Sequence, residues 1–134
     1  MPVSANPKKK DFYVYRFEID GYPFYIGIGR DKRGTDRLRY VKSLLKPHNK
    51  TKLQRASLHV RVIARFKRKG IDPKYCPIRK HLSRAGALAE EKKIILRLVD
   101  RGYLLTNWQH NRHRHRDATR AVRAISTKFR TSNR

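Results

Sequence analysis

The sequence is poor in acidic residues and in cysteine. Ten Asp and Glu stand against 35 Lys and Arg in 134 residues, and the formal net charge is +25 at pH 7. Such an excess of one sign repels itself in a folded chain unless a polyanion neutralises it. The one cysteine, Cys76, excludes an internal disulfide and a zinc site built from several cysteines. We therefore expect a nucleic-acid partner.

Long hydrophobic runs are also missing. No segment has the length of a membrane span, and the N-terminus lacks the apolar core of a signal peptide. The cations run through every segment rather than along one amphipathic helix, as a membrane-surface protein would have them. These absences predict a cytoplasmic protein without a membrane partner.

Hydrophobic residues make up 38% of the chain, which is enough for one modest core. Residues 1–10 are polar and cationic, and we expect them to be disordered. Residues 11–110 carry the patterned segments and predict one folded domain. Residues 111–134 form a basic tail with few apolar side chains, although Ala121, Val122 and Ile125 leave a short docked helix open.

The first patterned segments predict a β-hairpin. Residues 12–19 and 23–28 are rich in aromatic and β-branched side chains, and the turn signal Asp20-Gly21 separates them. A two-residue turn would put Tyr15 and Tyr25 on opposite faces, so we favour a three-residue loop that ends at Tyr22. In that register Tyr15 lies opposite Gly27.

The remaining patterns predict a mixed α+β fold: a small, mainly antiparallel three-stranded sheet flanked by helices. A first helix is expected from Thr35 or Asp36 to near Lys46, and a second, very basic helix over 49–69. A short strand follows around 75–82. Ser83 and Gly102 are typical start and stop residues for a helix over 84–101.

The glycine-rich stretch after the hairpin carries neither common nucleotide motif. Gly27 and Gly29 fill two positions of Gly-x-Gly-x-x-Gly, but the third falls on Lys32. Gly34-Thr35 lacks the lysine of a P-loop. The cations of this glycine-rich stretch are therefore either solvated or bind phosphates by charge alone, without a nucleotide motif.

One carboxylate is unusual. At roughly 100° per residue, Glu91 falls near the middle of an apolar face that includes Ala87, Leu88 and Ile95, whereas Glu90 falls beside Arg97 and Arg101. A carboxylate in apolar surroundings is costly unless a cation meets it. Glu91 is therefore either half of a buried salt bridge or a metal ligand or acid–base group in a cleft.

Taken in order, these elements resemble the GIY-YIG nuclease superfamily. The second strand motif is present as Tyr25-Ile26-Gly27, and the first in degenerate form as Tyr13-Val14-Tyr15. A helix arginine, Arg37, follows, and Ala87-Leu88 through Glu91 to Ile94-Ile95 is similar to the family's glutamate helix. Leu104-Leu105-Thr106-Asn107 is similar to its terminal strand with an asparagine. The resemblance covers roughly 12–110 and is closest to the restriction-type and LEM-domain-associated branch.

The resemblance implies a metal-dependent DNA endonuclease. Glu91 would hold one Mg²⁺ or Mn²⁺ ion, Tyr15 would act as general base, Tyr25 would share its proton network, and Arg37 would bind the phosphate oxygens. Tyr13, Gly27 and Asn107 would support the site. The sequence departs from the family at Tyr13, at Ile28, where a lysine is common, and at Val41, where a histidine or tyrosine is common. Arg33 is an alternative to Arg37 as the arginine that binds the phosphate oxygens.

Plainer interpretations remain open from the residues alone. The tyrosines can be core aromatics, Arg37 a surface cation and Asn107 a turn former. A non-catalytic basic protein that binds DNA or RNA by charge is the alternative function. In either case we expect the following cations to contact the phosphate backbone of the nucleic acid: Arg30, Lys32, Arg33, Lys52, Arg55, Arg112, Arg114 and Arg116.

Overall fold

The computed structural model describes residues 11–31, 33–113 and 115–132. Residues 1–10, Lys32 and Arg114, of which expectations were stated above, lie outside this part. In the described ranges the strands are β1 (Phe12–Ile19), β2 (Tyr22–Arg30) and β3 (Lys74–Leu82). The helices are α1 (Arg33–Leu44), the 3₁₀ turn η1 (Pro47–Asn49), α2 (Lys50–Arg55), α3 (Leu58–Arg68), α4 (Arg84–Asp100) and α5 (Ala118–Ser132).

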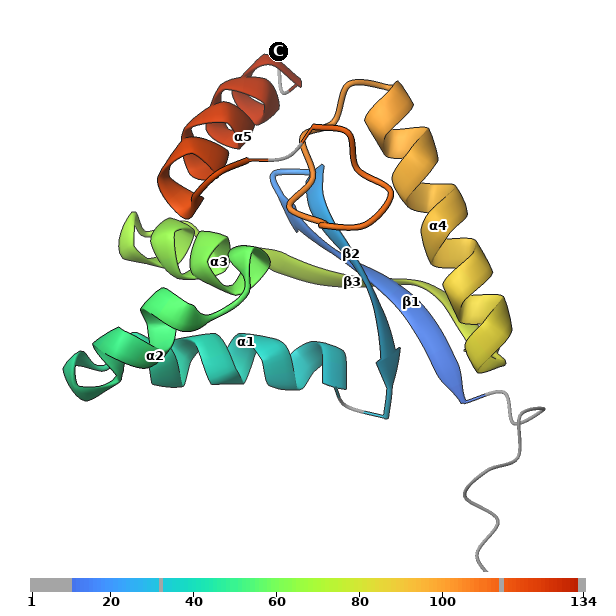
Figure 1. Ribbon diagram of the computed structural model, residues 1–134, viewed down its shortest axis with the longest axis horizontal. Coiled ribbons are helices and arrows are strands. Elements are labelled where there is room, and N and C mark those ends of the chain that lie inside the picture. Colours follow the sequence, from blue (N-terminus) through green and yellow to red (C-terminus); the bar gives the residue numbers. More distant parts are fainter. Residues whose placement is uncertain (1–10, 32, 114, 133–134) are drawn as a thin grey trace, which may run out of the picture.

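The fold is mixed α+β, as predicted, with one antiparallel sheet of order β2-β1-β3. Figure 1 shows α4 on one side of the sheet and α1, α2, α3 and α5 on the other. Each side has its own core: Val14 and Ile26 pack with α4, whereas Tyr15 and Phe17 pack with the other helices. None of the described helices is both long and apolar enough to cross a membrane.

The hairpin forms, but its turn differs from the expected one. Ile19 pairs with Tyr22, so only Asp20 and Gly21 connect the strands, and both have positive φ (49° and 79°), as a tight hairpin turn of type I′ requires. The expected three-residue loop is wrong.

A β-bulge nevertheless places the side chains of the hairpin on the faces of the sheet that were expected. The register shifts between Phe17 and Glu18, so that Phe24 is an extra residue in β2. On the side of the bulge away from the turn, Phe17 lies opposite Tyr25, and Tyr15 lies opposite Gly27, as predicted. The bulge therefore places the tyrosines on one face, which the loop was expected to do.

The long helix expected over 49–69 is also wrong. Ala56 and Ser57 are extended (ψ 161° and 158°), and they separate α2 from α3. The break changes the direction of the chain, so that α3 can bury a broad apolar face that includes Val62, Ile63 and Phe66. Phe66 reaches the sheet, where its ring lies 6.0 Å from that of Phe24.

Helix α4 has the predicted ends. The Ser83 hydroxyl accepts a hydrogen bond from the Gly86 amide at 3.0 Å, and Gly102 has φ 88°. Its buried residues are Ala87, Ile95 and Val99, whereas Leu88 is exposed, contrary to the predicted apolar face. Glu90 lies near Arg79 of β3 (Oε1 to Nη1 3.8 Å), not in the expected pair with Arg97 or Arg101.

The basic C-terminal segment contains a helix of 15 residues, α5, where the sequence left a short docked helix open. Its buried residues are Ala118, Ala121, Val122, Ile125 and Phe129, and they belong to the same core as Tyr15 and Phe17. Phe129 contacts Phe66 of α3, with ring centroids 6.4 Å apart. Helix α5 is thus part of the packed molecule.

Candidate functional site

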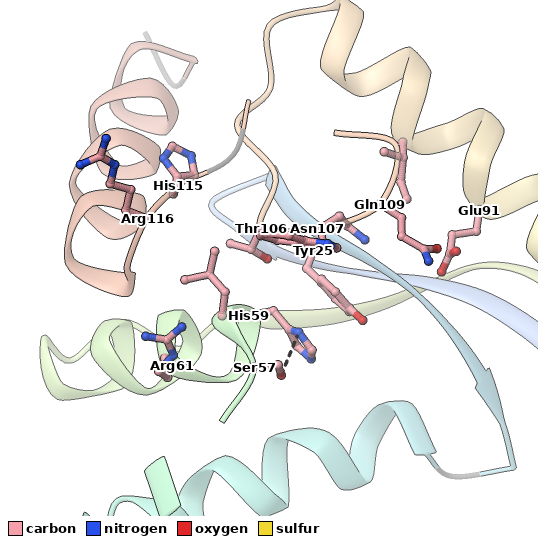
Figure 2. A pocket seen from close by; sticks show the side chains of 13 residues that line it. Tyr25, Ser57, His59, Arg61, Glu91, Thr106, Asn107, Gln109, His115 and Arg116 are labelled. Carbon is pink, nitrogen blue, oxygen red and sulfur yellow. Dashed lines mark hydrogen bonds between the residues drawn. The ribbon is translucent and has the colours of Figure 1, made fainter. Parts of the chain in front are cut away.

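A cavity of about 490 Å³ lies between the sheet, α3, α4 and the segment that follows α4. Figure 2 shows its side chains: Arg61, Arg116 and His115 lie on one side, Glu91 and Gln109 on the other, and Tyr25 and His59 between them. Two of the four predicted catalytic residues, Tyr25 and Glu91, line this cavity. Tyr15 and Arg37 are not among its lining residues. Tyr15 contacts Tyr25, and Arg37 contacts His59.

Two glycines of β2 allow the tyrosines of β1 to lie flat across the sheet. A Cβ atom on Gly27 would come within 2.5 Å of Tyr15 Cζ and 2.9 Å of Tyr25 Cε2. A Cβ atom on Gly29 would lie 2.3 Å from Tyr13 Cζ. Real Cβ contacts are essentially never this short, so the phenol rings occupy the space that side chains at these two positions would need.

Tyr15 and Tyr25 form a buried pair. Their ring centroids are 6.2 Å apart, and their hydroxyl groups share a hydrogen bond. Tyr15 is only 1% exposed. Burial raises the pKa of both phenols above the usual range, while the Arg37 charge opposes this effect without cancelling it. Both hydroxyl groups are therefore protonated at neutral pH in the free protein.

Tyr13, the third predicted tyrosine, lines a different cavity together with Tyr75 and Asp31. Its hydroxyl donates a hydrogen bond to the Asp31 carbonyl oxygen at 2.9 Å. Its ring is 6.0 Å from that of Tyr15. Tyr13 therefore contacts the candidate site through Tyr15.

Arg37 of α1 reaches the tyrosine pair through a histidine. Its Nη1 atom donates to His59 Nε2 at 2.8 Å, and the His59 ring is stacked on Tyr25 with centroids 3.9 Å apart. Burial and the neighbouring Arg37 charge lower the pKa of His59 to about 3, so the ring is neutral. Because Nε2 accepts, the ring proton is on Nδ1, which donates to Ser57 Oγ at 3.3 Å.

Glu91 lies half-buried in α4 and faces the cavity. Of the two interpretations left open by the sequence, the salt bridge is absent: Glu91 forms no ion pair with any residue that the structure describes. Burial raises the pKa of its carboxyl, and its charge in turn raises that of Tyr25. Figure 2 shows the Gln109 and Glu91 side chains pointing toward one another.

The residues present fit a divalent cation held by one carboxylate. Across the described ranges, no group of three or more His, Cys, Asp and Glu side chains gathers as a ready-made metal site. Mg²⁺ does not require one, because it keeps several waters and commonly binds through one or two carboxylates together with substrate phosphates. An unpaired carboxylate beside an open cavity satisfies that requirement.

Asn107 acts as a substitute for a paired strand. Its Oδ1 atom accepts from the Ile26 amide at 3.0 Å, and its Nδ2 atom donates to the Ile26 carbonyl at 2.7 Å. One residue earlier, the Thr106 amide donates to the Phe24 carbonyl at 2.7 Å. The 104–107 segment thus packs back on the sheet and fixes the backbone between Tyr25 and Gly27.

The predicted backbone-binding cations have different environments. Arg116 lines the cavity, and Lys52 and Arg55 are exposed on α2. Arg30 pairs with Asp11 at 3.2 Å, and Arg112 with Asp100 at 2.9 Å. Lys32, Arg114 and the side chain of Arg33 lie outside the described part of the chain.

Sequence reasoning missed several residues of this cavity, namely His59, Arg61, Trp108 and Gln109. His59 and Arg61 lay within the helix wrongly expected to run straight through 49–69. A clue was present at 107–109, where the only tryptophan stands between two amide residues in a segment otherwise suited to a turn.

The chain shows no significant match to any protein-family model, curated protein or solved structure with which it was compared.

Proposed function

We propose that the protein is a metal-dependent endonuclease that hydrolyses DNA phosphodiester bonds with Mg²⁺ or Mn²⁺. The observation that carries this proposal is Glu91, a half-buried carboxylate that forms no ion pair with the described residues of a chain of charge +25. A cation-rich protein normally pairs such a group, because an unpaired buried carboxylate is costly. A cation bound with the substrate would offset that cost. As part of the proposal, we place the enzyme in the cytoplasm.

The neighbours of Glu91 have the groups that phosphodiester hydrolysis needs. Bound at Glu91, the metal would neutralise charge on the scissile phosphate and its leaving oxygen. Tyr25 faces the cavity and touches Tyr15, so once one phenol of the pair has lost its proton, the resulting phenolate would take up the proton of the attacking water. Arg37 would stabilise charge near the phenols while His59 holds its guanidinium in place.

The phenol pKa values determine the expected pH profile. Because burial keeps both hydroxyl groups protonated at neutral pH, the fraction of phenolate rises about tenfold per pH unit below the pKa. Cleavage that depends on this phenolate should therefore accelerate from pH 7 to pH 9. A Tyr25→Phe variant should lose both the activity and this dependence.

The first experiment is nicking of supercoiled plasmid with Mg²⁺, with Mn²⁺ and with EDTA. Glu91→Gln is compared with Glu90→Gln, which removes the same charge from the adjacent residue. We expect Glu91→Gln to nick at least about 100-fold more slowly while it still binds DNA, whereas Glu90→Gln and wild type nick equally. Equal nicking by Glu91→Gln and wild type would contradict the proposed site.

The alternative is a non-catalytic protein that binds DNA or RNA by charge. Its support is the formal charge of +25, which phosphate contacts would neutralise without any cleavage. Binding that weakens with salt does not separate the two, since both rely on phosphate contacts. Intact plasmid under all metal conditions, with tight binding, would support the binding protein.

A further inference from the structure

The same cavity has an exposed aromatic side chain at its edge. Trp108 lines the cavity and is 70% exposed, the largest value among the exposed large hydrophobic side chains of the described residues. A tryptophan normally buries roughly 150–250 Å² of surface. At this exposure the ring gives up much of that stabilisation, and most of its surface is accessible to a ligand in the cavity.

The backbone that carries Trp108 is held firmly on both sides. Asn107, the preceding residue, is bound to Ile26 by two hydrogen bonds. On the other side, Asn111 Nδ2 donates to the Leu105 carbonyl at 2.8 Å and to the Asn107 carbonyl at 2.9 Å. The ring therefore projects from a fixed segment, so little conformational entropy is lost when a ligand stacks on it.

The other walls of the cavity suit the remaining parts of a nucleotide. Arg61 and Arg116 both lie on the side of the cavity opposite Glu91 (Figure 2). Their guanidinium groups match phosphate oxygens in charge and geometry. The Gln109 amide offers both a donor and an acceptor for a base edge. A volume of about 490 Å³ lies within the range of roughly 300–1,000 Å³ typical of small-molecule pockets.

We propose that this cavity binds an unpaired nucleotide of the DNA strand, with its base stacked on Trp108 and the neighbouring phosphates on Arg61 and Arg116. Bases inside a duplex are covered on both faces by their neighbours, whereas a base in a single strand, gap or overhang has a free face. Stacking on an aromatic side chain is a common and sequence-tolerant way to bind such a base. The enzyme would then act where duplex DNA meets unpaired DNA. This inference rests on the proposed function, because it names the substrate of the same site.

Trp108 is the only tryptophan, so its fluorescence reports on this position alone. The test is a titration in EDTA with three DNA molecules: a single strand, a blunt duplex and the duplex with an unpaired end. We expect strong quenching by the single strand and by the unpaired end, and weak quenching by the blunt duplex. Equal quenching by all three would overturn the proposal.

Abasic DNA separates stacking from charge. A single strand with abasic sites keeps its phosphates but has no base to stack. By anisotropy of labelled DNA, wild type should bind this strand about tenfold more weakly than the normal strand, and Trp108→Ala should bind both equally. Trp108→Phe should recover most of the difference. If Trp108→Ala weakens binding to both strands alike, the ring does not stack on a base and the proposal fails.

The outcomes also separate this inference from the proposed function. Metal-dependent nicking without quenching would leave the nuclease in place and overturn the nucleotide site. Quenching that depends on bases, with no cleavage under any metal condition, would keep the nucleotide site and overturn the nuclease.

Discussion

At the scale of single residues, Gly27 determines whether the two phenols can occupy their positions. Tyr15 is buried on all sides and cannot turn away from a new methyl group 2.5 Å from its ring. We therefore expect Gly27→Ala to lower the free energy of unfolding by about 2–3 kcal/mol, which is typical of overpacking in a core. Urea denaturation followed by circular dichroism measures this change.

Gly29→Ala is the matched control. Its methyl group would meet the ring of Tyr13, which is only half-buried and borders an open cavity. That ring can swing outward and give up its hydrogen bond to Asp31, so the cost should be about 1 kcal/mol. Equal losses in the two variants would show that Tyr15 has more room than its burial indicates.

The neutral state of His59 predicts acid sensitivity. Its pKa is about 3 in the folded protein and about 6.5 when unfolded, so the unfolded chain binds more protons between these values. The contribution of His59 to the free energy of unfolding is complete above pH 6.5. It is lost as the pH falls toward 3, at up to about 1.4 kcal/mol per pH unit. His59→Gln should show a flatter dependence of the unfolding free energy on pH in this window. A slope identical to that of wild type would mean that His59 titrates normally in the folded chain.

At the scale of elements, the asparagine after α4 substitutes for a missing strand. Asn107→Ala would leave the buried amide and carbonyl of Ile26 without partners, and each unpaired group costs about 1–3 kcal/mol. We expect a loss of about 2–4 kcal/mol and rapid hydrogen exchange at the Ile26 amide.

Thr106→Val provides the comparison for Asn107→Ala. Thr106 Oγ1 donates to the Phe24 carbonyl at 3.0 Å, but the Thr106 amide also donates there, so the carbonyl keeps a partner. This variant should lose about 1 kcal/mol or less, with unchanged exchange at Ile26. Slow exchange in Asn107→Ala would show that Ile26 is protected by something other than the asparagine.

The elements that were predicted correctly are those with local signals. The hairpin follows from β-branched and aromatic residues around Asp20-Gly21, and α4 follows from Ser83 and Gly102 at its ends. The bulge at Phe24 and the break at Ala56-Ser57 have no local signal, because tertiary packing produces them. The strand-like role of Asn107 depends on a partner 81 residues away.

The candidate site was partly predictable for the same reason. Glu91 was conspicuous because an acid interrupted an apolar face, and the tyrosines because they alternate along a strand. The partnership of Arg37 with His59 joins α1 to the start of α3 and required the break at Ala56-Ser57. No periodicity in the sequence encodes that contact.

At the scale of the whole molecule, some of the cations lie where they could extend the candidate site. A third cavity, of about 330 Å³, is lined by Lys50, Arg61, Arg65 and Arg68, and Asp117 is the only acid among its lining residues. Arg61 lines this cavity and the candidate site alike. A DNA strand that leaves the site past Arg61 would therefore continue along α3.

This path predicts which charges contribute to the salt dependence of DNA binding. Each phosphate contact adds about 0.9 to the slope of log K against log salt concentration for duplex DNA. Replacing exposed Arg65 and Arg68 by Gln should lower the magnitude of the slope by about 2, measured by anisotropy in EDTA. Lys92 and Lys93 are equally exposed but lie on α4, on the opposite side of the sheet, so replacing them by Gln removes the same charge and should change the slope by less than about 0.5. Equal changes for the two pairs would mean that DNA is attracted by the total charge of the molecule and follows no fixed path from the site.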